Sequence, residues 1–124
     1  MSKKMLQKTK MRKIRHRRVR KTISGNAASP RLNIFRSLKH IYAQVIDDVA
    51  GTTLLSLSTN TPEIKEKLES EMDRKAQSKI VGKILGEKMK EQGLASITFD
   101  RGGYLYHGRV KALAEGMRES GMKF

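Results

Sequence analysis

The sequence has 124 residues, a formal net charge of +15 and no cysteine. This length allows one domain with a modest core, and the lack of cysteine excludes a disulfide framework and thiolate metal ligands. With three scattered histidines and no apolar run of membrane-spanning length, we expect a soluble, cytoplasmic protein that holds no metal or cofactor and enters no membrane.

The positive charge is concentrated at the start of the chain. The first 46 residues hold 14 of the 27 Lys and Arg residues and none of the 12 Asp and Glu residues. Solubility alone does not need this asymmetry, because mixed charges serve it better. A polyanionic partner explains the asymmetry, since each phosphate that a cation neutralises releases bound counterions. The charge distribution therefore predicts nucleic-acid binding.

Residues 1–24 are predicted to form a basic, flexible N-terminal arm. Dense like charges repel one another, and the few apolar residues cannot offset the entropy lost on ordering. Bound phosphate would relieve this repulsion and let the arm fold as a helix. A nuclear targeting signal, a membrane-surface anchor and a solvated extension are alternative interpretations of such a run. The predicted RNA-binding residues of the arm are Lys3, Lys4, Lys8, Lys10, Arg12, Lys13, Arg15, His16, Arg17, Arg18, Arg20 and Lys21.

Residues 25–30 are small and polar and are expected to link the arm to a globular domain at residues 31–124. The first two segments of this domain alternate between apolar and polar residues, as half-buried strands do, and a third strand follows a turn. The connections between these segments are short, which predicts an antiparallel meander. The three strands are expected at residues 31–37, 40–48 and 52–58.

Helical signals follow the third strand. Pro62 suits a first helical position. Two apolar stripes further along lie on opposite sides of one helical cylinder, so a break is expected near Glu69–Met72. Ser70 would cap the second helix and Asp73 would be the acidic partner of a capping box. This second helix is expected to end at Gly93.

A fourth strand at residues 94–100 and a final helix at residues 108–121 complete the predicted order β-β-β-α-α-β-α. Because the fourth strand follows a helix, it can join the sheet parallel to one neighbour. The predicted fold class is therefore α+β, with a mixed sheet, helices packed on the sheet and a basic arm in front.

The segment between the fourth strand and the last helix has the features of a phosphate-binding loop. Gly102 and Gly103 let the backbone approach a ligand closely, and the start of the helix presents free N–H groups. Arg101 and Arg109 add positive charge at the two ends of the loop. A P-loop is excluded, because the Gly-Lys-Ser/Thr half of that motif is missing. The rings available for stacking on bases are those of Tyr104, Tyr106 and His107.

Two other classes of function remain open at this point. Asp100 and His107 lie close enough in the chain to meet in a small hydrolase, but no third catalytic group lies near them in the sequence. A general RNA chaperone or duplex-binding module would also explain the basic arm. The small number of catalytic groups favours a protein that is not an enzyme.

Two long segments of the globular domain resemble one known family. They are residues 31–59, "RLNIFRSLKHIYAQVIDDVAGTTLLSLST", and residues 99–124, "FDRGGYLYHGRVKALAEGMRESGMKF". Both resemble the bacterial family of large-subunit ribosomal protein eighteen, which binds 5S rRNA. The strings "IYAQVIDD" and "DRGGYLYHGRVKALA" are long and unusual, so the resemblance is specific.

The resemblance implies a structural constituent of the large ribosomal subunit that binds 5S rRNA and helps attach it to 23S rRNA in the central protuberance. It implies a non-catalytic protein that is a monomer within the ribosome, and it leaves open contacts with neighbouring 5S-binding ribosomal proteins. On the globular domain, the RNA contacts that it implies are Arg31, Arg36, Lys39, His40, Arg101, Gly102, Gly103, Tyr104, His107 and Arg109.

Overall fold

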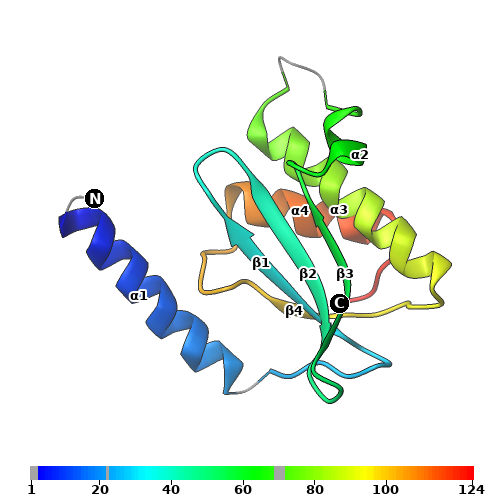
Figure 1. Ribbon diagram of the computed structural model, residues 1–124, viewed down its shortest axis with the longest axis horizontal. Helices are drawn as coiled ribbons and strands as arrows, with labels where there is room; N and C mark the ends of the chain where they lie inside the picture. Colours follow the sequence, from blue (N-terminus) through cyan, green and yellow to red (C-terminus); the bar gives the residue numbers. More distant parts are fainter. Residues whose placement is uncertain (1–2, 22, 69–71) are drawn as a thin grey trace.

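The computed structural model describes residues 3–21, 23–68 and 72–124. Its elements follow one another in the order α-β-β-β-α-α-β-α, so the predicted order holds after an additional N-terminal helix (Figure 1). The elements are α1 (Lys3–Arg20), β1 (Arg31–Arg36), β2 (Ile41–Asp47), β3 (Thr52–Ser58), α2 (Pro62–Lys65), α3 (Arg74–Glu91), β4 (Thr98–Asp100) and α4 (Gly108–Glu119).

The four strands form one mixed sheet in the order β3-β2-β1-β4. The pairs β1–β2 and β2–β3 are antiparallel, which confirms the predicted meander. β4 pairs with β1 in parallel, as a strand that returns from a helix can. β4 is shorter than predicted, because only Thr98–Asp100 pair along β1, whereas Ser96 bridges to Lys123 near the end of the chain. The predicted α+β class is confirmed.

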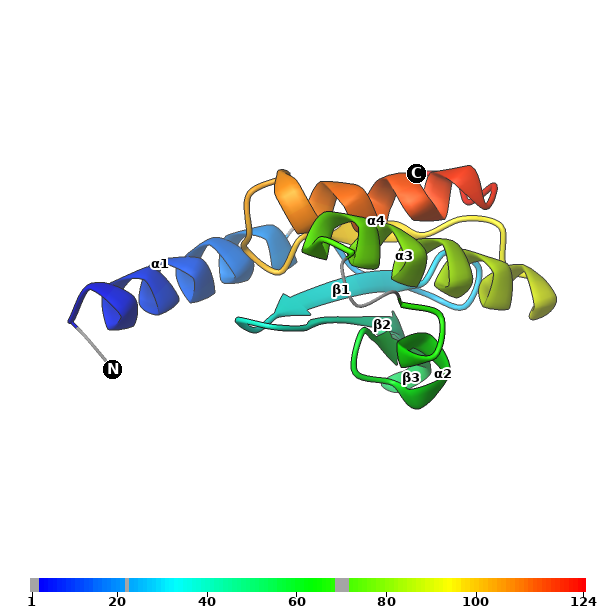
Figure 2. The same ribbon diagram turned by 90° about the horizontal axis from the view of Figure 1, so that it is seen from above.

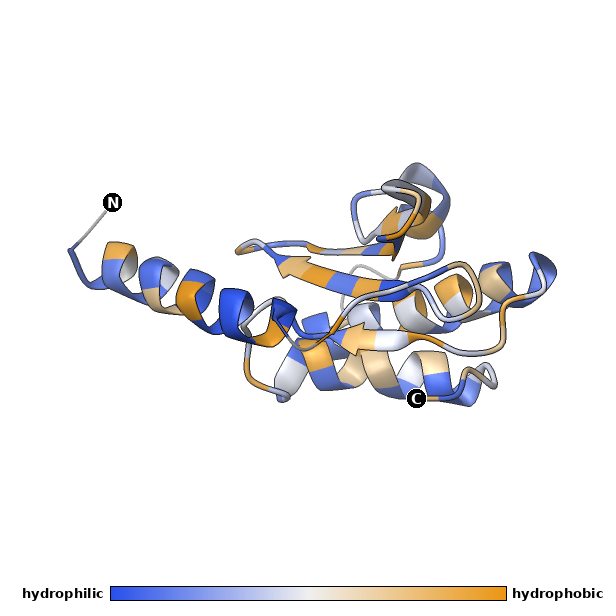
Figure 3. Ribbon diagram, turned by 90° about the horizontal axis from the view of Figure 1, so that it is seen from below, coloured by the Kyte–Doolittle hydropathy of each residue, from blue (hydrophilic) through white to orange (hydrophobic). Residues whose placement is uncertain are grey.

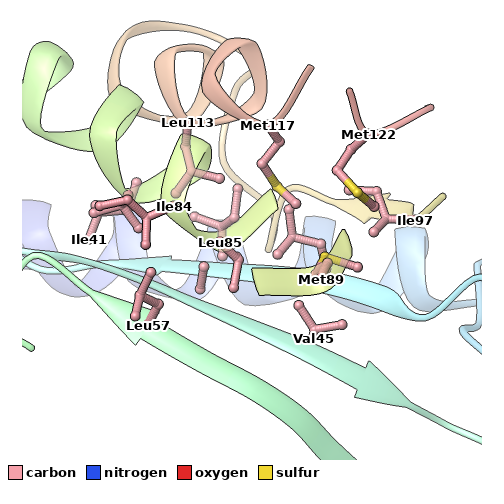
Figure 4. Packing of buried hydrophobic residues seen from close by; sticks show 14 of the residues in the cluster. Ile41, Val45, Leu57, Ile84, Leu85, Met89, Ile97, Leu113, Met117 and Met122 are labelled. Atoms are coloured by element: carbon pink, nitrogen blue, oxygen red, sulfur yellow. The ribbon is translucent and has the colours of Figure 1, made fainter. Parts of the chain in front are cut away.

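The core lies between one face of this sheet and the helices α3 and α4 (Figure 2). Alternation along β1 and β2 sends every second side chain into it, including Leu32, Ile34 and Val45. Figure 4 shows Leu85 of α3 and Met117 of α4 reaching the same interior. Burying these apolar side chains is the main favourable term that holds the layers together.

The helices α3 and α4 cross at two glycines. A Cβ atom on Gly82 of α3 would meet the backbone of Leu113, and one on Gly116 of α4 would meet the backbone of Lys79. The two backbones therefore approach more closely than larger residues allow. This contact holds α4 in place and fixes where the loop before it ends.

The region between β3 and α3 differs in detail from the prediction. α2 is a four-residue helix with Pro62 in its first turn. The predicted break near Glu69–Met72 and the predicted cap Ser70 fall largely or wholly on residues 69–71, which lie outside the described residues. Asp73 is itself the N-cap of α3, accepting a hydrogen bond of 2.8 Å from the Ala76 N–H, rather than the acidic partner of another cap.

The N-terminal segment is a helix of 18 residues that projects from one end of the domain (Figures 1 and 2). Ten of its residues are Lys or Arg and none is acidic, and Figure 3 shows it as largely hydrophilic. The prediction of a flexible arm is not confirmed, because the middle of α1 is hydrogen-bonded to the globular domain. In the described part of the chain, no helix has the length and apolar character needed to cross a bilayer.

Candidate nucleic-acid interface

The loop between β4 and α4 binds the side chains of α1. The Arg12 Nη1 donates to the Gly102 carbonyl at 3.2 Å, and the Arg15 Nε donates to the Gly103 carbonyl at 2.9 Å. These two residues lie one turn apart on α1, so both face the loop. Gly102 and Gly103 were predicted to belong to a phosphate-binding loop. Their carbonyl oxygens accept hydrogen bonds from two arginines of the same chain.

The backbone of α1 lies close to the loop at Gly103. A Cβ atom there would meet the Arg12 carbonyl oxygen and would lie 3.0 Å from the backbone nitrogen of His16. The φ angle of Gly103 is +83°. Any side chain would both push α1 away and strain the backbone. The close backbone approach predicted for Gly103 is present, and its partner in this structure is α1.

A buried carboxylate anchors the C-terminal half of α1. The Asp100 side chain is fully buried, and its Oδ2 accepts hydrogen bonds from Arg31 Nη1 at 2.7 Å and from His16 Nε2 at 2.8 Å. Its Oδ1 accepts from the Gly102 N–H at 2.9 Å, which fixes the turn. Asp100 thus joins α1, β1 and the loop in one network.

A second carboxylate continues this network toward the end of α1. Asp48 accepts hydrogen bonds from Arg31 Nε at 3.0 Å and from the Gly25 N–H at 2.7 Å, and Arg20 lies within 3.4 Å. The hydrogen bond from Arg31 is the main reason that the pKa of Asp48 is lowered to about 2. Burial by itself lowers the pKa of Arg31, but the hydrogen bonds and charges of Asp48 and Asp100 raise it above its ordinary value.

The ring of Tyr104 lies between two guanidinium groups. Arg12 of α1 is 4.9 Å from the ring centroid and Arg36 of β1 is 4.8 Å from it, which are cation–π distances. The hydroxyl accepts a hydrogen bond from the Arg36 N–H and donates one to the Arg36 carbonyl. Tyr104 is 9% exposed, and its side chain packs between α1 and the β1–β2 hairpin.

The β1–β2 hairpin lies beside the same loop. Arg109, in the first turn of α4, donates from Nη1 to the Ser37 carbonyl at 3.0 Å. Burial lowers the pKa of Arg109, and the charges of Arg36 and Arg74 lower it further. His40 has a structural partner, since its Nδ1 lies 3.0 Å from the Thr59 hydroxyl.

The predicted site residues therefore separate by exposure. Those that are buried in this structure are Arg31, Gly102, Gly103 and Tyr104. Those that are half-buried are Arg12, His16, Arg20, His40 and Arg109. Those that are exposed are Lys3, Lys4, Lys8, Lys10, Lys13, Arg15, Arg17, Arg18, Lys21, Arg36, Lys39, Arg101 and His107.

The geometry does not assemble the catalytic pair considered from the sequence. Asp100 is bonded to His16, which lies 84 residues away in the chain, and to Arg31, while His107 is exposed. Within the described ranges, no group of three or more His, Cys, Asp and Glu residues could hold a metal ion. Sequence reasoning missed that His16 and Asp100 anchor a helix, because nothing in the sequence shows that the two meet.

A groove of about 710 Å³ runs between α1 and β1. Cations from both elements line it, together with the rings of Phe35 and Tyr104; the cationic residues are Lys4, Lys8, Arg12, Arg15 and Arg36. Phe35 was not predicted as a site residue, although the alternation along β1 places it opposite the core residues Leu32 and Ile34. The combination of a cationic groove and one exposed ring, that of Phe35, suits a nucleic acid.

A basic helix held on a small α+β domain, with the acidic residues nearest to it committed to ion pairs, defines a protein with a cationic surface of the kind that binds polyanions. Residues 6–124 match the family described as ribosomal L18 of archaea, bacteria, mitochondria and chloroplast. The chain belongs to the ribosomal L18 family.

Curated relatives support this assignment over nearly the whole chain. The large ribosomal subunit protein uL18 of Petrotoga mobilis is 55% identical over 121 residues, which is 98% of this chain and 98% of the relative. The protein of the same name from Alkaliphilus metalliredigens is 54% identical over the same span. The one from Streptococcus suis is 58% identical over 117 residues, which is 94% of this chain and 93% of the relative.

Proposed function

We propose that this protein binds 5S rRNA and helps attach it to 23S rRNA in the central protuberance of the large ribosomal subunit. As an L18 family member, the chain is a structural, non-catalytic constituent of that subunit and works in the cytoplasm. The observation that carries the finer proposal is α1, an 18-residue helix with ten cations and no anion, seated on a folded domain.

In the proposed mechanism the two parts of the molecule do different work. The exposed cations of α1 bind phosphates, which supplies affinity that does not depend on sequence. The domain provides a rigid base with exposed Arg36, Lys39, Arg101 and His107 beside it. Gly102, Gly103 and Tyr104 act on RNA indirectly, because they are buried and hold α1 and the hairpin in place.

Three cations of α1 test this mechanism without disturbing its attachment. Lys10, Lys13 and Arg17 are exposed, and none of them makes the hydrogen bonds that dock α1. Replacing all three by Gln should weaken binding to 5S rRNA and reduce the slope of log K against log salt by about 2 to 3, since each lost phosphate contact on a duplex accounts for about 0.9. Filter binding at several salt concentrations measures the slope.

The control variant replaces three exposed lysines far from α1, namely Lys67, Lys83 and Lys90, by Gln. It has the same net charge as the test variant, so a loss caused by overall charge would appear in both. An unchanged slope in the α1 variant, or equal losses in the two variants, would contradict the proposal. A competition between 5S rRNA and an unrelated duplex of equal length separates specific binding from chaperone activity. A chaperone should bind both RNAs equally, whereas the proposed function predicts a preference for 5S rRNA.

A further inference from the structure

The helices α3 and α4 both lie on one face of the sheet and leave the opposite face uncovered by either of them (Figure 2). The residues of β1 and β2 that point away from the core reach this open face. A hollow of about 410 Å³ lies there and is lined by Asn33, Phe35, Ser37, Tyr42, Gln44 and Ser56.

Two aromatic rings lie side by side on this face. Phe35 and Tyr42 are register partners across β1 and β2, and their ring centroids are 6.0 Å apart at an angle of 37°. Cross-strand aromatic pairs stabilise a sheet, which accounts for their proximity. It does not account for the exposure of Phe35, which is 47%. The pair offers an open ring surface that a flat, aromatic ligand can cover.

Two carboxamides form the next pair along the same strands. Asn33 and Gln44 are register partners and line the hollow beside the rings. The Asn33 Oδ1 is buried and has no hydrogen-bond partner among the described residues. A carboxamide carries both donors and an acceptor, and rotation of its last torsion exchanges their places. Such groups suit the mixed donor and acceptor edge of a nucleobase.

Phe35 also lies at the boundary between this hollow and the cationic groove beside α1. The Arg12 guanidinium lies 5.6 Å from the centre of the Phe35 ring on the α1 side. Lys4, Lys8 and Arg15 line the groove beyond it. A cationic surface is therefore continuous with a surface of rings and amides.

We propose that the open face of the sheet binds an unpaired nucleotide of the RNA, with its base stacked on Phe35 and Tyr42 and its phosphate in the groove beside α1. The inference rests on the proposed function and adds a ligand class to it, because paired bases within a duplex cannot stack on a protein ring. Gln44, which is exposed, then contacts the edge of the base, and Asn33 lines the hollow beneath it. The carboxylates of an acidic peptide would account for binding in the cationic groove but not for the rings and amides of the hollow.

Three RNA hairpins that differ at one position test the proposal with the full chain. The first carries a single unpaired adenosine, the second carries an abasic residue at the same place, and the third is fully paired. The first two have equal charge, so only the base differs. The protein should bind the adenosine hairpin about tenfold or more tightly than the abasic one, which is the usual effect of one stacked base. Equal affinities for these two hairpins would overturn the proposal.

Variants of Phe35 locate the effect. Phe35→Leu should bring the affinities for the adenosine and abasic hairpins to within twofold of each other, whereas Phe35→Tyr should keep the preference because it keeps the ring. Phe124→Leu is the matched control, because Phe124 also has an arginine over its ring, with Arg118 at 4.4 Å, but lies outside the groove and the hollow. A preference that survives Phe35→Leu, or that Phe124→Leu removes equally, would also overturn the proposal.

A crosslink gives a second measurement that needs no variant. A 4-thiouridine at the unpaired position should crosslink to β1 or β2, and a crosslink only elsewhere would contradict the proposal. A separate measurement of 5S rRNA binding shows whether a negative result contradicts this inference alone or the proposed function as well. A protein that binds 5S rRNA with steep salt dependence but ignores the unpaired base disproves this inference alone, whereas a protein that does not bind 5S rRNA disproves the proposed function.

Discussion

Asp48 lies beside Gly25 and Arg31, and three groups converge on its carboxylate. Arg31 and the Gly25 N–H donate to it, and Arg20 lies nearby. The pKa of about 2, against an ordinary value of 3.8, means that the folded state favours the ionised carboxylate. The resulting stabilisation is complete above about pH 4 and is lost as the pH falls toward 2, and it amounts to about 2 kcal/mol.

The Asp48→Asn variant tests this effect. At pH 6 the variant should unfold with a free energy about 2 kcal/mol lower than that of the wild type, and the difference should shrink as the pH falls from 4 to 2. Urea denaturation at a series of pH values measures it. Glu91 is exposed, so Glu91→Gln should follow the wild-type curve at every pH. A constant difference between wild type and Asp48→Asn would show that the charge of Asp48 is not the cause.

At the scale of elements, the attachment of α1 to the β4–α4 loop is the contact that organises the site. An isolated helix of this length is marginal in water, and the repulsion among its ten cations makes it weaker still. Its order therefore depends on the contacts of Arg12 and Arg15 with the loop and of His16 with Asp100 at the end of β4.

The Gly103→Ala variant should detach α1, because the added Cβ would meet the helix backbone. The amides of residues 3–20 should then lose most of their protection from hydrogen exchange, while those of α3 keep theirs. Gly51→Ala is the matched control, since Gly51 also has a positive φ, of +71°, but an added Cβ there would meet nothing within 4 Å. Equal protection of α1 in both variants would show that Gly103 is not the docking point.

At the scale of the whole molecule, stability comes from the layer between the sheet and the α3–α4 pair (Figure 4). Leu85 is fully buried in this layer, and Leu105 in the β4–α4 loop is 73% exposed. Leu85→Ala should lower the free energy of unfolding by about 2 to 5 kcal/mol. Leu105→Ala should change it by less than about 0.5 kcal/mol. Thermal denaturation of both variants measures the difference, and similar melting temperatures would place the core elsewhere.

The local elements of the globular domain could be predicted well from the sequence, and the contacts between distant residues could not. Period-two alternation marked β1 and β2, because one face of each of these strands is buried, and β3 was recognised as the apolar run after a turn. The extent of β4 was overestimated, since pairing with β1 and not the apolar pattern decides where that strand begins. The alternation along β1 showed that Phe35 lies on the outer face of the sheet. Nothing in the sequence showed that α1 would form a groove beside it.

The sequence by itself determined the charge asymmetry, the α+β class and the family, because these follow from composition, periodicity and long shared strings of residues. Only the tertiary structure decided what the loop residues do. Gly102 and Gly103 accept hydrogen bonds from arginines of α1. Asp100 is hydrogen-bonded to His16 of α1, which lies 84 residues away in the sequence. Such pairings depend on how packed layers bring distant segments together, and no local pattern records them.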